Sequence, residues 1–203
     1  LAIGIPLGIL AALYRDSCLD RLVMSVAVFG FSMPNFFLGI LLILLFSLNL
    51  RLLPSSGSGT WAHLIMPAAT LGISFAAQFA RYTRSSMIDV LSKPYMRTAR
   101  SKGAGLARQM NKHALPNASV PIVTILGFKI GDLIGGAVIT ETVFAWPGIG
   151  RLLTNAVANR DLAVVQCIMI LLALTMVFAN AITDLIYGWI DPRVRVGAGA
   201  QQK

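Results

Sequence analysis

Residues 162–183 read LAVVQCIMILLALTMVFANAIT, and no side chain in this run carries a charge. Residues 22–50 form a second uncharged run. A helix needs roughly 20 mostly apolar residues to cross a hydrocarbon core about 30 Å thick. The composition points the same way, because 56% hydrophobic and 12% charged residues leave too little polar surface to cover a soluble globule. The sequence therefore predicts an all-α polytopic membrane protein.

Three further segments bring the expected number of transmembrane helices to about five. Residues 64–80 form a shorter uncharged run, and residues 118–143 form a run interrupted only by Lys129, Asp132 and Glu141. Residues 1–14 are apolar from the first position, with no initiator Met and no basic stretch before them. We therefore interpret residues 1–14 as the remainder of a longer helix and not as a signal peptide.

Positive side chains gather in alternate loops, and this pattern predicts the orientation of the spans. One side holds only Arg51, Arg151 and Arg160. The other side holds Arg15, Arg21, Arg81, Arg84, Lys93, Arg97, Arg100, Lys102, Arg108, Lys112, Arg193, Arg195 and Lys203. Because short cytoplasmic loops carry the excess of Lys and Arg, we expect the N-terminus outside and the C-terminus in the cytoplasm. The net charge of +9 then follows from topology, and we expect no nucleic-acid partner.

The most basic of these segments is residues 85–116, called here the basic loop. Pro94 suits the first turn of a short helix that runs over residues 95–102, and Gly103 suits its left-handed end. A second short helix is expected over residues 106–115, stopped by Pro116. Two interpretations of this helix–turn–helix unit stay open. It is a rigid surface that a soluble motor pushes, or it binds anionic lipid headgroups.

The fourth apolar run carries both small and charged residues. Gly127, Gly131 and Gly135 recur every fourth position, which predicts a close helix-packing seam. Lys129 and Asp132 lie near the expected membrane midplane, where charges are costly. They either line a translocation path or neutralise each other as a structural pair.

Two features at the ends of the runs also leave alternatives. Glu141 precedes Trp146-Pro147-Gly148, so it belongs either to an aromatic interfacial turn or to a contact with a delivered substrate or an extracytoplasmic protein. Pro34 removes a backbone hydrogen bond within the second run, which predicts a kink or break. Either the bent helices frame a path, or Ser32 and Asn35 only repair the backbone bonds that Pro34 frees.

The sequence contains no motif for catalysis or nucleotide binding. It has no G-x-x-x-x-G-K-[ST] loop to hold phosphate and no H-E-x-x-H zinc motif. His63 and His113 are predicted on opposite sides of the membrane, so we expect no metal site and no cofactor bound by this chain. The chain is therefore expected not to be an enzyme, and its energy must come from another polypeptide.

Three separated segments carry a resemblance to a known family. The stretch Tyr95 to Gly103, followed by His113-Ala114-Leu115-Pro116, resembles the cytoplasmic EAA-type loop of bacterial ABC-importer permeases. Ala99, Gly103, Leu115 and Pro116 match that pattern, whereas Arg97 and His113 depart from its general form. With these two residues, the stretch is similar to the corresponding loop in the subgroup of permeases for dipeptides, oligopeptides, nickel and glutathione. The block GGAVITETVFAWPGIG at residues 135–150 and the tail segments 184–187 and 191–193 resemble the same subgroup.

The resemblance implies a single permease domain over residues 1–203 in a bacterial inner membrane, with the basic loop as its cytoplasmic coupling loop. It implies a second permease subunit, two cytoplasmic ATPase subunits that use ATP and Mg²⁺, and an extracytoplasmic solute-binding protein that selects the substrate. The family's first transmembrane helix and extracytoplasmic segment have no counterpart in this chain. The residues assigned to ATPase coupling are Pro94, Tyr95, Ala99, Lys102, Gly103, His113, Leu115 and Pro116. Those assigned to the path are Lys129, Asp132 and Glu141.

Two other functions remain as alternatives. A secondary transporter with Lys129 and Asp132 as a proton-coupled pair would respond to a pH gradient and need no ATPase. An inactive truncated permease or an assembly scaffold is the second alternative, favoured by the abrupt apolar start.

Overall fold

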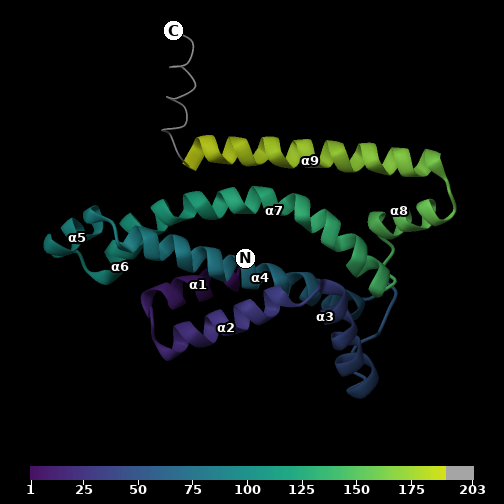
Figure 1. Cartoon of the computed structure of the whole chain (residues 1–203), viewed down its shortest axis with the longest axis horizontal. Helices are drawn as coiled ribbons and strands as arrows, with labels where there is room; N and C mark the ends of the chain where they lie inside the picture. The colour runs from purple at the N-terminus through teal and green to yellow at the C-terminus, as the bar shows by residue number, and fades with distance from the viewer. Residues whose placement is uncertain (191–203) are drawn as a thin grey trace, which may run out of the picture. The chain divides into compact units, whose positions relative to one another are not determined.

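The structure is a computed structural model that describes residues 1–190, except for the side chains of residues 127–128, 130–136, 184 and 186–190. Every element in this described part is a helix, which confirms the all-α prediction (Figure 1). The elements are α1 (Gly4–Leu13), α2 (Cys18–Ser32), α3 (Asn35–Leu42), the π-helix η1 (Ile43–Asn49), α4 (Trp61–Leu91), α5 (Pro94–Ser101), α6 (Leu106–Gln109), the π-helix η2 (Met110–Ala114), α7 (Leu115–Val143), α8 (Ile149–Ala158) and α9 (Leu162–Ile190).

The chain divides into two compact units, each described here by itself. The first contains Leu1–Val28, Ala76–Phe128 and, among the described residues, 180–190. The second contains Phe29–Phe75 and Lys129–Ala179. The basic loop belongs to the first unit, and α8 belongs to the second.

In the first unit, α1 approaches α4 so closely that two glycines are needed. A Cβ atom at Gly4 would overlap the carbonyl oxygen of Ala76, and one at Gly8 would overlap that of Ala80 and the side chain of Thr83. Small residues allow membrane helices to pack in this way without a hydrophobic driving force between them. This seam was not predicted from the sequence. The seam predicted at Gly127, Gly131 and Gly135 falls on residues whose side-chain positions lie outside the described part.

The predicted break at Pro34 is confirmed in the second unit. Pro34 is extended, with φ −60° and ψ 138°, and the chain bends by 101° between α2 and the helix that follows. The Asn35 side chain makes a contact with another helix here, because its Oδ1 accepts a hydrogen bond from Ser74 Oγ of α4 at 2.7 Å. The bend is therefore held by a side-chain contact between α3 and α4.

Within the described residues, two helices are long and apolar enough to cross a membrane. These are α4, with mean hydropathy 1.3, and Leu162–Thr183 of α9, with mean hydropathy 2.6. The bent pair Cys18–Ser32 and Asn35–Asn49 makes a third if it is one span. Helix α1 has 10 residues, about half of what a crossing requires. The total of about five spans stays a prediction.

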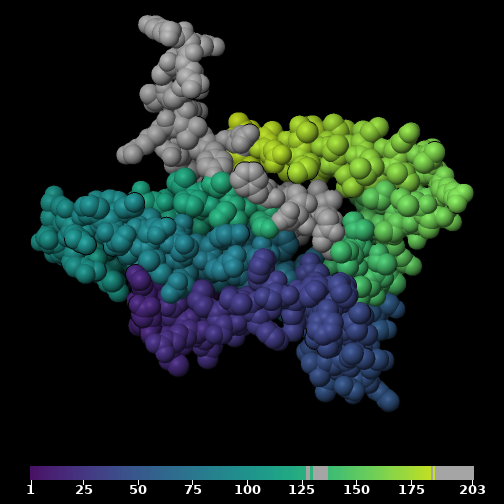
Figure 2. Space-filling model, in the orientation of Figure 1, coloured from purple at the N-terminus to yellow at the C-terminus, as the bar shows by residue number. Residues whose placement is uncertain are grey.

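Most of the large apolar side chains described in α9 are exposed, and Figure 2 shows this helix in yellow-green. Leu162, Ile170, Val177, Phe178 and Leu185 are all largely exposed. Side chains of this kind are stable against lipid or against another apolar protein surface, and not against water. The structure thus agrees with a chain that lies in a membrane.

Helix α4 extends further than the sequence indicated. The predicted span 64–80 is only the apolar part of a helix that continues through Arg84 to Leu91. Met87 and Val90 in this continuation are buried, which explains why the helix persists beyond the first charged residues. Residues 85–91 of the basic loop are consequently the last turns of α4.

We predict that Gly4→Ala and Gly8→Ala each lower the stability of the folded protein by about 1–3 kcal/mol, because the added methyl group has no room against the α4 backbone. Gly72→Ala is the matched control, since Gly72 lies within α4 and its Cβ would meet no atom within 4 Å. The control should be neutral or slightly stabilising. Thermal unfolding in detergent measures all three variants, and equal melting temperatures would show that the α1–α4 seam is not tight.

Candidate functional site

The first helix of the basic loop begins and ends as the sequence predicts. Pro94 occupies the first turn of α5, after Lys93 in an extended conformation with ψ 148°. Proline is suited to this position because the N–H that it lacks would have no partner within the helix. Ser92 does not cap α5; its Oγ donates to the carbonyl of Asp89 at 2.7 Å.

Gly103 ends α5 in the left-handed region, with φ +75°, as predicted. The Gly103 N–H donates to the Arg100 carbonyl at 3.0 Å, and the Ala104 N–H donates to the Ala99 carbonyl at 3.2 Å. This pair of bonds is a Schellman motif, which requires a residue that tolerates positive φ after the C-cap Lys102. The place of a Cβ at Gly103 is open, with no atom within 4 Å. Backbone conformation alone therefore selects glycine here.

A buried side chain holds the turn after α5 by a hydrogen bond. Gln109 in α6 is buried, with 6% of its surface exposed, and its Nε2 donates to the Ala104 carbonyl at 2.6 Å. Gly105 precedes α6 with ψ 159° and a negative φ of −63°. The second glycine is thus a turn residue of ordinary conformation, and only Gly103 of the two needs the left-handed region.

The prediction that Pro116 stops the second short helix is wrong. Helices α6, η2 and α7 follow one another without a gap, and Pro116 lies in the first turn of α7. Proline is tolerated there because η2 is wound as a π-helix, which takes up the irregularity that its ring would otherwise force. Asn117 Nδ2 donates to the His113 carbonyl at 2.7 Å, so a side chain also bonds to a carbonyl of η2 at this junction.

A buried methionine cluster fastens the basic loop to the helices around it. Met96 of α5 and Met110 of η2 are 4% and 7% exposed. They lie in one hydrophobic cluster with residues from α1, α4, η2 and α7, and we call this set the methionine cluster: Ala12, Met87, Val90, Met96, Met110, Ala114 and Ala118. Fully burying a methionine side chain contributes about 1.5–3 kcal/mol. The loop is therefore packed against the ends of α4 and α7 and is not a flexible connection between them.

The opposite face of the loop is exposed and strongly basic. The exposed cations of the basic loop are Lys93, Arg97, Arg100, Lys102, Arg108 and Lys112. No acidic residue occurs between Asp89 and Asp132 in the sequence. Two large apolar side chains, Tyr95 and Leu106, are 42% and 64% exposed on the same loop. Ala99, His113 and Leu115 are half-buried.

The predicted path residues of α7 are only partly covered by the structure. Lys129 is half-buried, whereas the side chain of Asp132 lies outside the described part. Whether these two residues pair or line a path stays a prediction.

Glu141 lies at the end of α7, and its carboxylate has a local role. Its Oε2 accepts the backbone N–H of Arg151 in the first turn of α8 at 2.9 Å, where the helix dipole favours a negative charge. The same carboxylate is packed against Gly148, which leaves no room for a Cβ. Glu141 therefore orders the turn into α8, and its contact with a substrate or protein stays a prediction.

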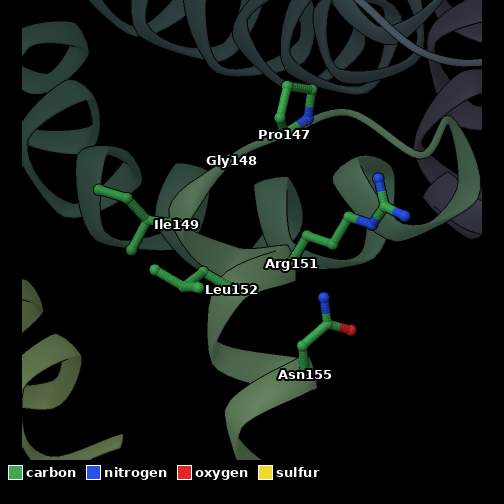
Figure 3. Close-up of a pocket in the computed structure, with 6 residues that line it drawn as sticks. All are labelled: Pro147, Gly148, Ile149, Arg151, Leu152 and Asn155. Carbon is green, nitrogen blue, oxygen red and sulfur yellow. The ribbon is translucent and has the colours of Figure 1, made fainter. Parts of the chain in front are cut away.

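A pocket of about 490 Å³ lies beside the first turns of α8. It is lined by Pro147, Gly148, Ile149, Arg151, Leu152 and Asn155. Figure 3 shows Ile149 and Leu152 pointing to one side of the helix, and Arg151 and Asn155 to the other. Arg151 Nη1 donates to the Ala145 carbonyl at 2.6 Å, so one of its donors is used within the turn between α7 and α8.

Sequence reasoning also missed an ion pair between Asp20 of α2 and Arg84 of α4, at 2.6 Å. The only signals were a carboxylate just before one apolar run and an arginine just after another. Neither residue stands in a motif.

Comparisons with known proteins identify the family and agree with the helical fold. Residues 4–196 match the family model described as the inner membrane component of binding-protein-dependent transport systems. The chain is 46% identical over 192 residues to the glutathione transport system permease protein GsiC of Escherichia coli K12, and equally to that of Salmonella paratyphi A. Each alignment covers 95% of this chain and 63% of the relative, so the chain spans less than two thirds of these relatives.

The fold is also similar to a solved chain of the MetNI methionine ABC transporter in an inward-facing conformation. The TM-score is 0.78 at 19% identity, and the match covers 94% of this chain and 87% of the solved chain. At this identity the likeness concerns the fold alone.

We predict that Gly103→Ala weakens the end of α5 by about 1 kcal/mol, because alanine resists positive φ. Gly105→Ala is the matched control, since its Cβ also meets open space but its φ is negative. Gly103→Asn should fall between the two, because asparagine tolerates the left-handed region. Hydrogen exchange at the amides of residues 103 and 104 reports the effect. Equal exchange in both alanine variants would contradict it.

Proposed function

Because the chain belongs to the family of inner membrane components of binding-protein-dependent transport systems, we propose that it is a permease subunit of an ATP-driven importer and that ATPase subunits act on its basic loop. The observation that carries this proposal is the two-sided construction of the loop. One face is buried in the methionine cluster, and the exposed residues from Lys93 to Lys112 include six cations, no acidic residue, and the large side chains of Tyr95 and Leu106.

This construction suits the transfer of motion better than the binding of lipid. A loop that only binds headgroups needs positive charge but no fixed shape. Here the turn is set by the Schellman motif at Gly103 and by the buried Gln109 amide, and the inner face is packed against α4 and α7. A partner that pushes on α5 and α6 therefore moves the ends of two long helices. The exposed cations favour a partner surface that is acidic.

The partners follow from the family. We propose a second permease subunit, two ATPase subunits that hydrolyse ATP with Mg²⁺, and an extracytoplasmic solute-binding protein. This chain would supply the path and not the chemistry, since its sequence contains no phosphate-binding loop. The path candidates are Lys129, Asp132 and Glu141, as the sequence analysis predicts.

For the substrate we propose a short peptide or a related small solute. The support is the similarity to GsiC, whose name identifies a glutathione permease. Delivery by a binding protein would leave selection mainly to that partner, so the residues of this chain need only admit a small polar solute.

The proposed orientation places the basic loop and the C-terminus in the cytoplasm. Support comes from the charge distribution and from one feature of the first unit. The turn after α1 and the basic loop are both predicted on the cytoplasmic side, and Ala12 at the end of α1 packs in the same cluster as Met96 of α5. Two loops on one side of a membrane can meet in this way, whereas loops on opposite sides cannot.

We predict that the chain, co-expressed with the ATPase subunits encoded beside it, retains them through purification from detergent. Replacing Arg97, Arg100 and Arg108 with glutamine should lower the retained ATPase about tenfold, since exposed ion pairs contribute about 0.2–1 kcal/mol each. Arg51→Gln combined with Arg160→Gln is the control, because these exposed cations are predicted on the other side. Full retention by the loop variant, together with loss of binding to anionic lipid vesicles, would favour the lipid-binding interpretation instead.

A further inference from the structure

The turn between α1 and α2 is held in one conformation by a buried carboxylate. Asp20 Oδ2 accepts the backbone N–H of Asp16 at 2.9 Å, and the Asp20 N–H donates to Ser17 Oγ at 3.2 Å. Asp16 itself has φ 63°, a left-handed conformation that aspartate tolerates better than most residues. The Asp20 side chain is only 4% exposed. The hydrogen bonds that hold the turn are thus made by the buried Asp20 and not by the side chains exposed at residues 15 and 16.

Asp20 is joined in turn to α4. Arg84 Nε donates to Asp20 Oδ1 and Arg84 Nη2 donates to Asp20 Oδ2, both at 2.6 Å. Two parallel bonds between a guanidinium and a carboxylate fix the orientation of the partners as well as their distance. The nearby pair of Arg15 and Asp16 differs, because its side chains are 60% and 77% exposed and approach to 3.3 Å at one contact. Of these two pairs, only Asp20–Arg84 is buried enough to constrain the backbone.

Arg84 immediately precedes the basic loop and lies about one helical turn before Met87 on α4. Met87 and Val90 follow it on α4, and both belong to the methionine cluster with Met96 and Met110. The end of α1 enters that cluster through Ala12. The α1–α2 turn is therefore fastened to the root of the loop on two sides, by the ion pair and by apolar packing.

We propose that Asp20 and Arg84 are positioning residues that make the α1–α2 turn and the basic loop move as one body when the ATPases act. The inference rests on the proposed function, since it requires a partner that moves the loop. Motion of the loop then reaches α2 through the ion pair as well as α4 and α7 through the chain itself. Helix α2 leads to the bend at Pro34, so the pair connects the motor-facing loop to a break within a transmembrane segment.

The test is hydrogen exchange of the assembled transporter in lipid nanodiscs, measured with and without MgATP. In the wild type, residues 14–17 should change their exchange together with residues 94–109. In Asp20→Asn combined with Arg84→Gln, the loop should still respond to MgATP while the response of residues 14–17 is lost. This double variant leaves no unpaired charge buried, and the amide oxygen of the introduced asparagine can still accept the Asp16 N–H. Arg15→Gln is the matched control and should behave as the wild type.

The possible outcomes distinguish failure of the ion pair's role from failure of the proposed function. The role of the pair would be overturned if residues 14–17 of the double variant still responded to MgATP together with the loop. It would also be overturned if the wild-type loop responded to MgATP and residues 14–17 did not. A merely structural role would raise exchange at residues 14–17 equally in both nucleotide states and leave the MgATP-dependent difference in place. A wild-type loop that ignores MgATP would overturn the proposed function itself, and the inference with it.

Discussion

The packing of two methionines under a basic loop is the contact on which the arrangement of the first unit depends. Met96 and Met110 belong to segments that are short and, apart from these side chains, mostly polar, so neither segment would be a stable helix alone. Their burial against Met87 and Val90 ties the loop to α4 and to the start of α7. Unbranched thioether side chains fill irregular spaces well, which suits a place where several helices meet.

That contact also separates the chemical roles of the two loop faces. Apolar burial holds the inner face, so the cations of the outer face are not needed for the fold of the loop and are exposed to a partner. The same division occurs on a smaller scale at the α1–α2 turn. There Asp20 is buried against Arg84, whereas Arg15 and Asp16 remain at the surface. In the second unit, Glu141 orders the start of α8 in a similar way.

Much of this arrangement follows from local sequence rules. Pro94, Gly103 and Pro34 act through their own backbone restrictions, so their effects were predictable without knowledge of the rest of the chain. Pro116 was misjudged because its consequence depends on the helix before it, where a π-helical turn accommodates the ring. The Asp20–Arg84 pair joins residues 64 positions apart, and the Gly4 and Gly8 seam depends on which helix lies opposite. Such contacts follow from tertiary packing and leave no local pattern. The roles of the charged residues and glycines near the middle of α7 stay predictions.

The basic loop is proposed to convert ATP hydrolysis into solute movement, and uptake per ATP hydrolysed tests this most directly. Proteoliposomes would contain the chain with its partner subunits, with ATP on the ATPase side, the solute-binding protein opposite, and glutathione and alanyl-alanine as probes. Gly103→Trp is compared with Gly103→Ala, since both carry the same backbone strain but only the first adds bulk to the open outer side of the turn. We predict ATP-dependent uptake in the wild type and a much lower ratio of uptake to hydrolysis for Gly103→Trp than for Gly103→Ala. An unchanged ratio for Gly103→Trp, or uptake driven by a pH gradient without ATP, would contradict this role of the loop.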